Sequence, residues 1–304
     1  MPDKERAVVR PQPDHEWKYA QSRFDHLPTI PFRTLASGKS ASGKGVLMVN
    51  AVTNFYRKCF KRIFVFASPV EVDSTFKAIE HYAIRELQQG KAQFMYDSFN
   101  EKALEQITVA QKEDIQRQKD DPDRKGPLKG CLIVVDDLSH DGALRRMQGG
   151  VSSRLWTVAR HYGISLWCNV HSINSLGSLA RRQASCAVVF PIANYKEKDT
   201  IREMYGQLAG SLKKFDEILD VATGPNAEPY SFLTIHTGAK TFKKTFMLRF
   251  EAYLEPESDS ESFFCFSCSD ITVAIESGAT QSLNTLLHIF GRVRGWVVGP
   301  RTTP

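Results

Sequence analysis

The segment Pro31–Val46, PFRTLASGKSASGKGV, decides the fold. A short run with strand character ends in a cluster of glycine, serine and lysine, and a helical pattern follows from Val46 to Cys59. Strand, loop and helix in this order are the setting of a phosphate-binding loop. Residues Gly38–Gly45 fit the pattern G-x-x-x-x-G-K, with glycine in the last position, where serine or threonine is usual.

The chemistry of phosphate binding explains this pattern. Glycines let consecutive backbone N–H groups turn toward a phosphate, and the positive end of the next helix faces the same anion. Lys44 is expected to reach between the β- and γ-phosphates of ATP, whereas Gly45 lacks the hydroxyl that usually ligates Mg²⁺. A glycine-rich turn that binds nothing is the alternative. The predicted nucleotide contacts are Gly38, Lys39, Ser40, Ala41, Ser42, Gly43, Lys44, Gly45 and Val46.

A second motif is an acidic pair after the most apolar run of the chain. Cys131–Val135 (CLIVV) has no polar position, which is typical of a central parallel strand buried on both faces, and Asp136 and Asp137 follow it directly. Ligands of open α/β sheets bind at the carboxyl ends of the strands. On an extended strand end the two side chains would point to opposite sides. Asp136 is then the predicted Mg²⁺ ligand and Asp137 the predicted general base, unless the pair only caps a turn.

The remaining pattern predicts an α/β fold with a doubly wound, mostly parallel sheet and helices on both faces. A solvated helix end and loop are expected over Gln111–Gly130, and Tyr230–His236 is expected to be the last strand. The other predicted strands are Arg62–Ala67, Ala92–Tyr96, Ile164–Val170 and Ala187–Pro191, and the other predicted helices are Ser74–Gln89, Val151–His161, Lys196–Tyr205 and Ser211–Ala222.

Bulk composition sets wider limits. Hydrophobic residues make up 42% of the 304-residue chain, and the formal net charge is +6, a mild bias toward polyanions. Neither a secretory signal nor an apolar run long enough for a membrane span is found, so an intracellular protein, cytoplasmic or nuclear, is expected. Cys265 and Cys268 form a lone C-x-x-C without a second ligand pair, which argues against a zinc site.

Changes in composition suggest three segments. Residues 1–27 are polar and proline-rich and read as an N-terminal arm. The motifs all fall within residues 28–254, the predicted ATPase domain. An acidic, serine-rich break, EPESDSE, then leads into residues 255–304, a linker and C-terminal extension whose role the sequence does not indicate.

Four motifs together resemble the genome-packaging ATPases of large double-stranded DNA viruses, the poxvirus-type branch of the FtsK/HerA superfamily. The segments that carry the resemblance are PFRTLASGKSASGKG with KRIFVFASP, CLIVVDDL, LWTVARHYGISLWCNVHS and SLARRQASCAVVFP, which follow one another in the family's order over roughly residues 28–240. In this comparison His171 takes the position of a polar sensor at a strand end. It is either a contact of the attacking water or a satisfied polar residue at a strand terminus.

The resemblance implies a RecA/FtsK-like P-loop NTPase that uses ATP and Mg²⁺. It also implies a homo-oligomeric ring, a hexamer, that threads double-stranded DNA into a capsid at a viral assembly site, with capsid proteins as further partners and no membrane. An arginine of one subunit would reach the γ-phosphate held by its neighbour, and Arg181 matches the family segment best. The other candidates for this role are Arg154, Arg160 and Arg182. The alternative for Arg160 and Arg181 is a surface or salt-bridging residue.

Departures from the family pattern leave alternatives open. Gly45 replaces the hydroxyl residue, Ala159 replaces a glycine, His171 stands where glutamine is usual, and Gln183 stands near an expected asparagine. Gly45 and His171 bear on hydrolysis more than on nucleotide binding. The predicted function is therefore an ATP-hydrolysing DNA translocase. The alternatives are a catalytically impaired, nucleotide- or DNA-binding relic of such an enzyme, and a small-molecule P-loop kinase.

Overall fold

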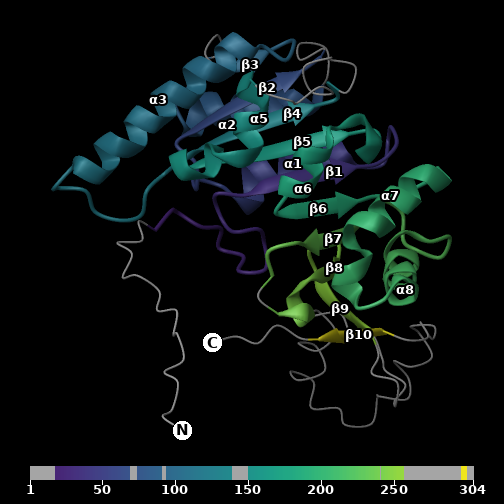
Figure 1. The fold of residues 1–304 in the computed structure, drawn as a ribbon. Coiled ribbons are helices and arrows are strands. Elements are labelled where there is room, and N and C mark those ends of the chain that lie inside the picture. The colour runs from purple at the N-terminus through teal and green to yellow at the C-terminus, as the bar shows by residue number, and fades with distance from the viewer. Residues whose placement is uncertain are drawn as a thin grey trace, which may run out of the picture.

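A ten-stranded sheet organises the chain in the computed structural model (Figure 1). The structure describes residues 18–68, 74–90, 94–138, 150–239, 241–256 and 296–299. The strands lie in the order β10-β9-β8-β7-β6-β1-β5-β4-β2-β3. Their bounds are Arg33–Ser37 (β1), Arg62–Ala67 (β2), Met95–Tyr96 (β3), Cys131–Asp136 (β4), Ile164–Val170 (β5), Cys186–Val189 (β6), Leu233–His236 (β7), Phe246–Leu248 (β8), Ala252–Pro256 (β9) and Trp296–Gly299 (β10).

The sheet changes direction at one place. From β6 through β3 neighbouring strands are parallel, and from β6 to β10 they are antiparallel. The first strand, β1, lies between β5 and β6, so the loop that follows it stands in the middle of the carboxyl edge. The segments after β4, β5 and β6 leave the sheet at this same edge, and it is therefore where a ligand site is expected.

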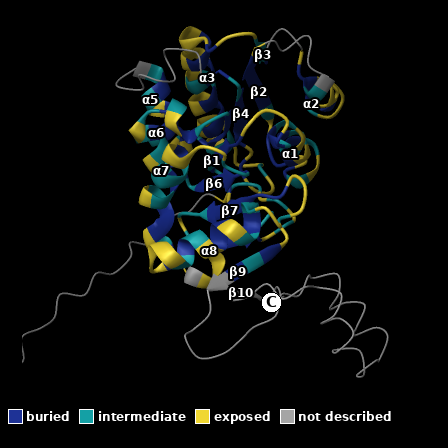
Figure 2. Ribbon diagram, turned by 90° about the vertical axis from the view of Figure 1, so that its right-hand side faces the viewer, coloured by how far each residue is buried: buried dark blue, intermediate teal, exposed yellow. Residues whose placement is uncertain are grey.

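Helices cover both faces of the sheet, as Figure 2 shows with the buried strands between them. One face packs against α1, α2 and the π-helical turn η1, and the other against α3, α5, α6, α7 and α8. The helices are α1 (Lys44–Asn50), η1 (Ala51–Phe55), α2 (Ser74–Glu86), α3 (Glu101–Asp120), α5 (Gly150–Thr157), α6 (Ser178–Gln183), α7 (Tyr195–Tyr205) and α8 (Leu212–Thr223). Short 3₁₀ turns are η3 (Ala159–Tyr162), η4 (Ile173–Ser175), η5 (Gly206–Ala209) and η6 (Phe242–Lys244).

The apolar run of β4 explains this two-sided core. Leu132 and Val134 belong to the cluster beneath α1 and α2, whereas Ile133 and Val135 belong to the cluster beneath α3 and α5. Alternate residues of a strand face opposite sides of a sheet, so a strand covered on both faces needs apolar residues at every position.

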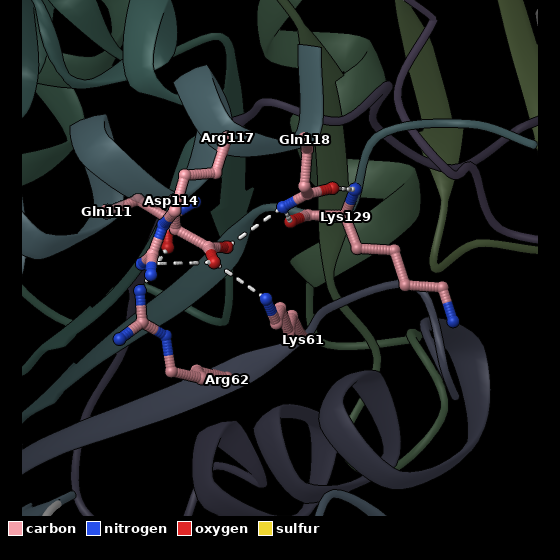
Figure 3. A network of polar contacts seen from close by, with 7 residues as sticks. All are labelled: Lys61, Arg62, Gln111, Asp114, Arg117, Gln118 and Lys129. Carbon is pink, nitrogen blue, oxygen red and sulfur yellow. Dashed lines mark hydrogen bonds and ion pairs between the residues drawn. The ribbon is translucent and has the colours of Figure 1, made fainter. Parts of the chain in front are cut away.

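Polar contacts attach α3 to the start of β2 (Figure 3). Lys61 Nζ lies 2.6 Å from Asp114 Oδ1, and Gln118 donates to Asp114 Oδ2 at 2.9 Å. Arg62 donates to Gln111 Oε1 at 2.9 Å. Burial opposes ionisation of Asp114, but the hydrogen bonds from Lys61 and Gln118 outweigh it, and the pKa of this carboxyl lies below its usual value. These contacts hold the charge-rich helix α3 against the start of β2.

The expected α/β architecture, with a mostly parallel sheet and helices on both faces, is confirmed. One expectation about its elements is wrong. Tyr230–His236 is not the last strand, because β8, β9 and β10 extend the sheet beyond it, and β7 begins only at Leu233. The expected helix end and loop over Gln111–Gly130 are confirmed, since α3 ends at Asp120 and a loop follows, but this helix is 20 residues long and its inner face is buried.

Candidate nucleotide site

The loop after β1 borders a pocket of about 740 Å³ at the carboxyl edge of the sheet. The loop lines it from Ser40 through Val46, and residues from the helix that follows the loop and from five further segments complete its wall. These further residues are Leu47, Asn50, Phe55, Thr75, Asp136, Asp137, Asn169, Val170, His171, Phe190, Tyr230 and Phe232. Residues that are far apart in the sequence, from positions 40 to 232, therefore meet at one cavity.

Two glycines shape the loop. Gly43 has φ of +99°, in the region that side-chain-bearing residues avoid, and it directly precedes α1. Gly38 leaves the strand so close to its neighbours that a Cβ there would lie 2.6 Å from the Cβ of Phe190. The glycine pattern of the sequence thus has a steric cause at both positions, and it keeps the loop backbone open toward the pocket.

Lys44 is held against the loop itself. Its side-chain Nζ donates to the carbonyl oxygens of Gly38 and Lys39, the second at 2.8 Å. Burial lowers the pKa of Lys44, and the carboxylates of Asp136, Asp137 and Glu197 partly offset that effect. The ammonium therefore lies at the centre of the site, within the field of three acidic groups.

Ser42 adds a second polar group to the loop. Its hydroxyl Oγ is buried and has no hydrogen-bond partner among the described residues. A buried hydroxyl without a partner is uncommon because desolvation is costly when no hydrogen bond replaces water. An anion in the loop would supply the missing acceptor.

Gly45 faces α2. A Cβ built at this position would lie 3.3 Å from Cγ2 and 4.0 Å from Oγ1 of Thr75, which itself lines the pocket. The side chain of Thr75 therefore fills the space next to the position where most phosphate loops carry a hydroxyl.

The acidic pair and the histidine come together as the sequence suggested. His171 Nε2 lies 2.7 Å from Asp137 Oδ1, and both side chains are partly exposed. Asp136 ends β4, but Asp137 has φ of +51°, a left-handed conformation. The expectation that both carboxylates stand on extended backbone is therefore wrong at Asp137, where the chain already turns.

Glu197 is a buried carboxylate that sequence reasoning missed. It lies in the first turn of α7, and its Oε1 accepts hydrogen bonds from the Ser37 hydroxyl and the Ile173 backbone N–H, each at 2.8 Å. These contacts tie the end of β1 to the segment just after His171. An acidic residue in the first turn of a helix was the available signal, but such residues usually face solvent.

An aromatic wall was missed as well. Phe190 and Phe232 pack with ring centroids 5.1 Å apart, and Tyr230 lies beside Gly43 with 69% of its surface exposed. Phe190 stands at the end of a predicted strand, which was a usable signal. Tyr230 was placed at the start of a predicted strand, but the structure puts it in the turn before β7.

The candidate arginines lie outside the pocket wall. Arg181, on α6, donates to Asn174 Oδ1 at 3.4 Å, and Arg182 is its neighbour on the same short helix. Arg160 lies in η3, just before β5 and therefore at the amino edge of the sheet, and Arg154 lies on α5. None of these four side chains lines the pocket of its own chain.

The described residues offer no cluster of three or more histidine, cysteine or acidic side chains that would hold a metal by itself. The carboxylates of Asp136 and Asp137 are oxygen donors of the kind that Mg²⁺ prefers, together with phosphate oxygens and water. The donor set thus fits Mg²⁺ bound together with a nucleotide. Cys265 and Cys268 lie outside the described residues. Within the described ranges, no helix is long and apolar enough to cross a membrane.

Comparisons with known proteins show which family and which fold the chain resembles. A sequence profile for the family described as Poxvirus A32 protein matches residues 20–239. The solved structure of B204, the DNA-packaging ATPase from Sulfolobus turreted icosahedral virus, is 13% identical, with a TM-score of 0.50 over 72% of this chain and 97% of that chain. The genome packaging NTPase B204 from Sulfolobus turreted icosahedral virus 2, in complex with sulfate, is 13% identical, with a TM-score of 0.50 over 73% and 97%. Both likenesses concern the fold alone. A search of curated proteins found no match.

Proposed function

Since the chain belongs to the Poxvirus A32 protein family, we propose that it hydrolyses ATP to move double-stranded DNA into a viral capsid. The resemblance suggested by the sequence motifs is confirmed, and the chain is a P-loop ATPase of the viral genome-packaging type. The observation that carries the proposal is the single pocket wall shared by the phosphate loop, the acidic pair and His171.

In the proposed mechanism the loop holds the phosphates. Lys44 exchanges its contacts with the carbonyls of Gly38 and Lys39 for phosphate oxygens, and Ser42 gains a hydrogen-bond acceptor. Asp136, Asp137 and Glu197 act together on Lys44, so three carboxylates surround one ammonium in the site. A nucleotide without a cation would be repelled. Mg²⁺ held at Asp136 would supply the compensating charge.

Asp137 and His171 are the proposed pair for the attacking water. His171 donates to Asp137 and fixes the orientation of its carboxylate, which then accepts a proton from water aimed at the γ-phosphate. The missing hydroxyl of Gly45 supports the second candidate, a relic that binds nucleotide without turnover. The family match favours an ATPase over the small-molecule kinase.

The test is phosphate release by the purified full chain, with and without linear double-stranded DNA. We expect DNA to stimulate hydrolysis. Lys44→Ala should lose both nucleotide binding and hydrolysis, whereas Asp137→Asn should keep binding and lose at least 100-fold in kcat. Lys125→Ala, on an exposed loop, is the matched control for Lys44 and should behave as wild type.

Two outcomes separate the candidates. If the chain binds ATP with Mg²⁺ but releases no phosphate above background, the DNA translocase is rejected and the nucleotide-binding relic without turnover is supported. Hydrolysis that ignores DNA would leave an ATPase without the proposed translocation. We further propose a homo-oligomeric ring, a hexamer, that acts at the site of viral assembly and contacts capsid proteins, with Arg181 reaching into the neighbouring subunit's site.

A further inference from the structure

The pocket has two chemically different sides, and the strand order separates them. β1 lies between β5 and β6, so its loop has β4 and β5 on one side and β6 and β7 on the other. Asp136, Asp137 and His171 follow β4 and β5. Phe190 follows β6, and Tyr230 and Phe232 precede β7, whose first residue pairs with Val189 at the same edge. The charged groups and the aromatic groups thus stand on opposite sides of the phosphate loop.

This polarity orients a nucleotide. The γ-phosphate belongs on the side with the carboxylates and the histidine, because Asp136 would hold Mg²⁺ there and Asp137 with His171 would hold the attacking water. The α-phosphate and the nucleoside must then extend to the other side, toward Phe190, Phe232 and Tyr230. The aromatic side of the same pocket lies where the base of a bound nucleotide would arrive.

Tyr230 stands there in a conformation that its own packing does not explain. It is the third residue of a turn in which Ser231 N–H donates to Glu228 O at 3.1 Å, and its φ is +61°. Glycine or asparagine usually takes such a position, because a bulky side chain is strained there. Its side chain is not buried, since 69% of the residue is exposed. Strain at an exposed residue that lines a pocket is characteristic of functional sites.

The turn that carries Tyr230 is held by a side-chain hydrogen bond and by a proline. Arg249 Nη1 donates to Glu228 Oε2 at 2.8 Å, and Pro229 restricts the backbone directly before the tyrosine. The ring lies over the loop, with Cδ1 3.4 Å from the place that a Cβ of Gly43 would take. Gly43 keeps this space free, and the Phe190–Phe232 pair closes it on the sheet side.

We propose that Tyr230 is the base platform of the nucleotide site, with the purine ring stacked on its phenol above Phe190 and Phe232. This inference rests on the proposed phosphate site and adds the subsite for the base. Stacking uses the π-face that every base has, so the platform contributes affinity without strong selection between adenine and guanine. The ring, rather than its hydroxyl, is the part that acts.

The experiment measures dissociation constants of the full chain for ATP, GTP and inorganic tripolyphosphate, each with Mg²⁺. Tyr230→Ala should lower the affinities for ATP and GTP by similar factors, about 10- to 100-fold. The affinity for tripolyphosphate should stay unchanged. Tyr230→Phe should bind ATP within about twofold of wild type, because stacking needs only the ring. Lys44→Ala should weaken all three ligands.

A second variant separates function from folding. Tyr230→Gly removes the strained side chain from a left-handed position, so its Tm should equal or exceed that of wild type while its affinity for ATP falls as in Tyr230→Ala. Unchanged ATP affinity in both variants overturns the base platform, and so does an equal loss of tripolyphosphate binding. If the wild-type chain binds neither ATP nor tripolyphosphate, the phosphate site itself is refuted.

Discussion

Gly45 has no side chain, and the side chain of Thr75 occupies the space beside it. The glycine lacks a side chain at the metal side of the loop, and the methyl group of Thr75 lies where it would crowd a Cβ at 3.3 Å. A side chain restored at position 45 would need Thr75 to yield by a few tenths of an ångström. Changing the two positions together removes this contact.

The prediction at this scale concerns turnover. Gly45→Ser alone should give little gain in kcat, since Thr75 crowds the new side chain. The double variant Gly45→Ser with Thr75→Ala should raise kcat at least about fivefold, because the hydroxyl can then reach Mg²⁺. Steady-state phosphate release at saturating ATP measures both, and Thr75→Ala alone is the control. A double variant no faster than wild type would show that Gly45 does not limit hydrolysis.

At the scale of elements, α3 depends on one buried carboxylate. The pKa of Asp114 lies below its usual value, so the unfolded chain binds a proton more readily than the folded one. Its contribution to stability is therefore complete above the unfolded pKa of about 3.8 and is lost as the pH falls through the folded pKa.

Asp114→Asn should accordingly lower the free energy of unfolding at pH 7 by about 1 to 3 kcal/mol, the usual worth of hydrogen bonds to a charged group. The difference from wild type should shrink as the pH falls below about 3.8. Urea unfolding at several pH values measures it. Glu113→Gln, an exposed neighbour with the same change of charge, should cost less than about 0.5 kcal/mol. Equal costs for the two variants would contradict the role of Asp114.

Most elements could be predicted from the sequence because their signals are local. The wholly apolar Cys131–Val135 and the glycine pattern of Gly38–Gly45 each require one kind of structure. The misses are not local. The first half of α3, from Glu101, was not among the predicted elements, and the helix is held by partners near residue 61, some 50 positions away. Strand β8 is only three residues long and is specified by the neighbours it pairs with, which no periodicity reveals.

The candidate site divides in the same way. Lys44, Asp136, Asp137 and His171 were predicted from their motifs, and the structure brings all four to one pocket. Their catalytic roles stay predictions. Glu197, Thr75 and Tyr230 belong to no motif, and each acquires its position from a tertiary contact or a turn. Asn169 did carry a signal, as a polar residue within an apolar strand, where it links Trp167 and Met48.

For the whole molecule, the position of Arg181 outside its own pocket suits a contact across subunits. Arg181→Ala and Lys44→Ala should each be inactive alone. Mixed rings contain interfaces in which an intact site meets an intact arginine, so an equimolar mixture should recover on the order of a quarter of wild-type activity. Re-assembly from dissociated subunits and a phosphate-release assay test this. A mixture that stays inactive while forming rings would place the arginine elsewhere, and Arg85→Ala, at an exposed position of α2, is the control.

The sheet changes from parallel to antiparallel pairing between β6 and β7, and the nucleotide pocket lies at this boundary. A nucleotide held by the loop after β1 and by the turn before β7 would act as a removable cross-link between chain segments about 190 residues apart. Such a link stabilises the folded state by mass action and couples the two halves of the sheet. Nucleotide binding would then stabilise the β6–β7 strand pair, and release would loosen it. Hydrogen exchange of the backbone amides along β6 and β7 should therefore be slower with nucleotide bound than without it.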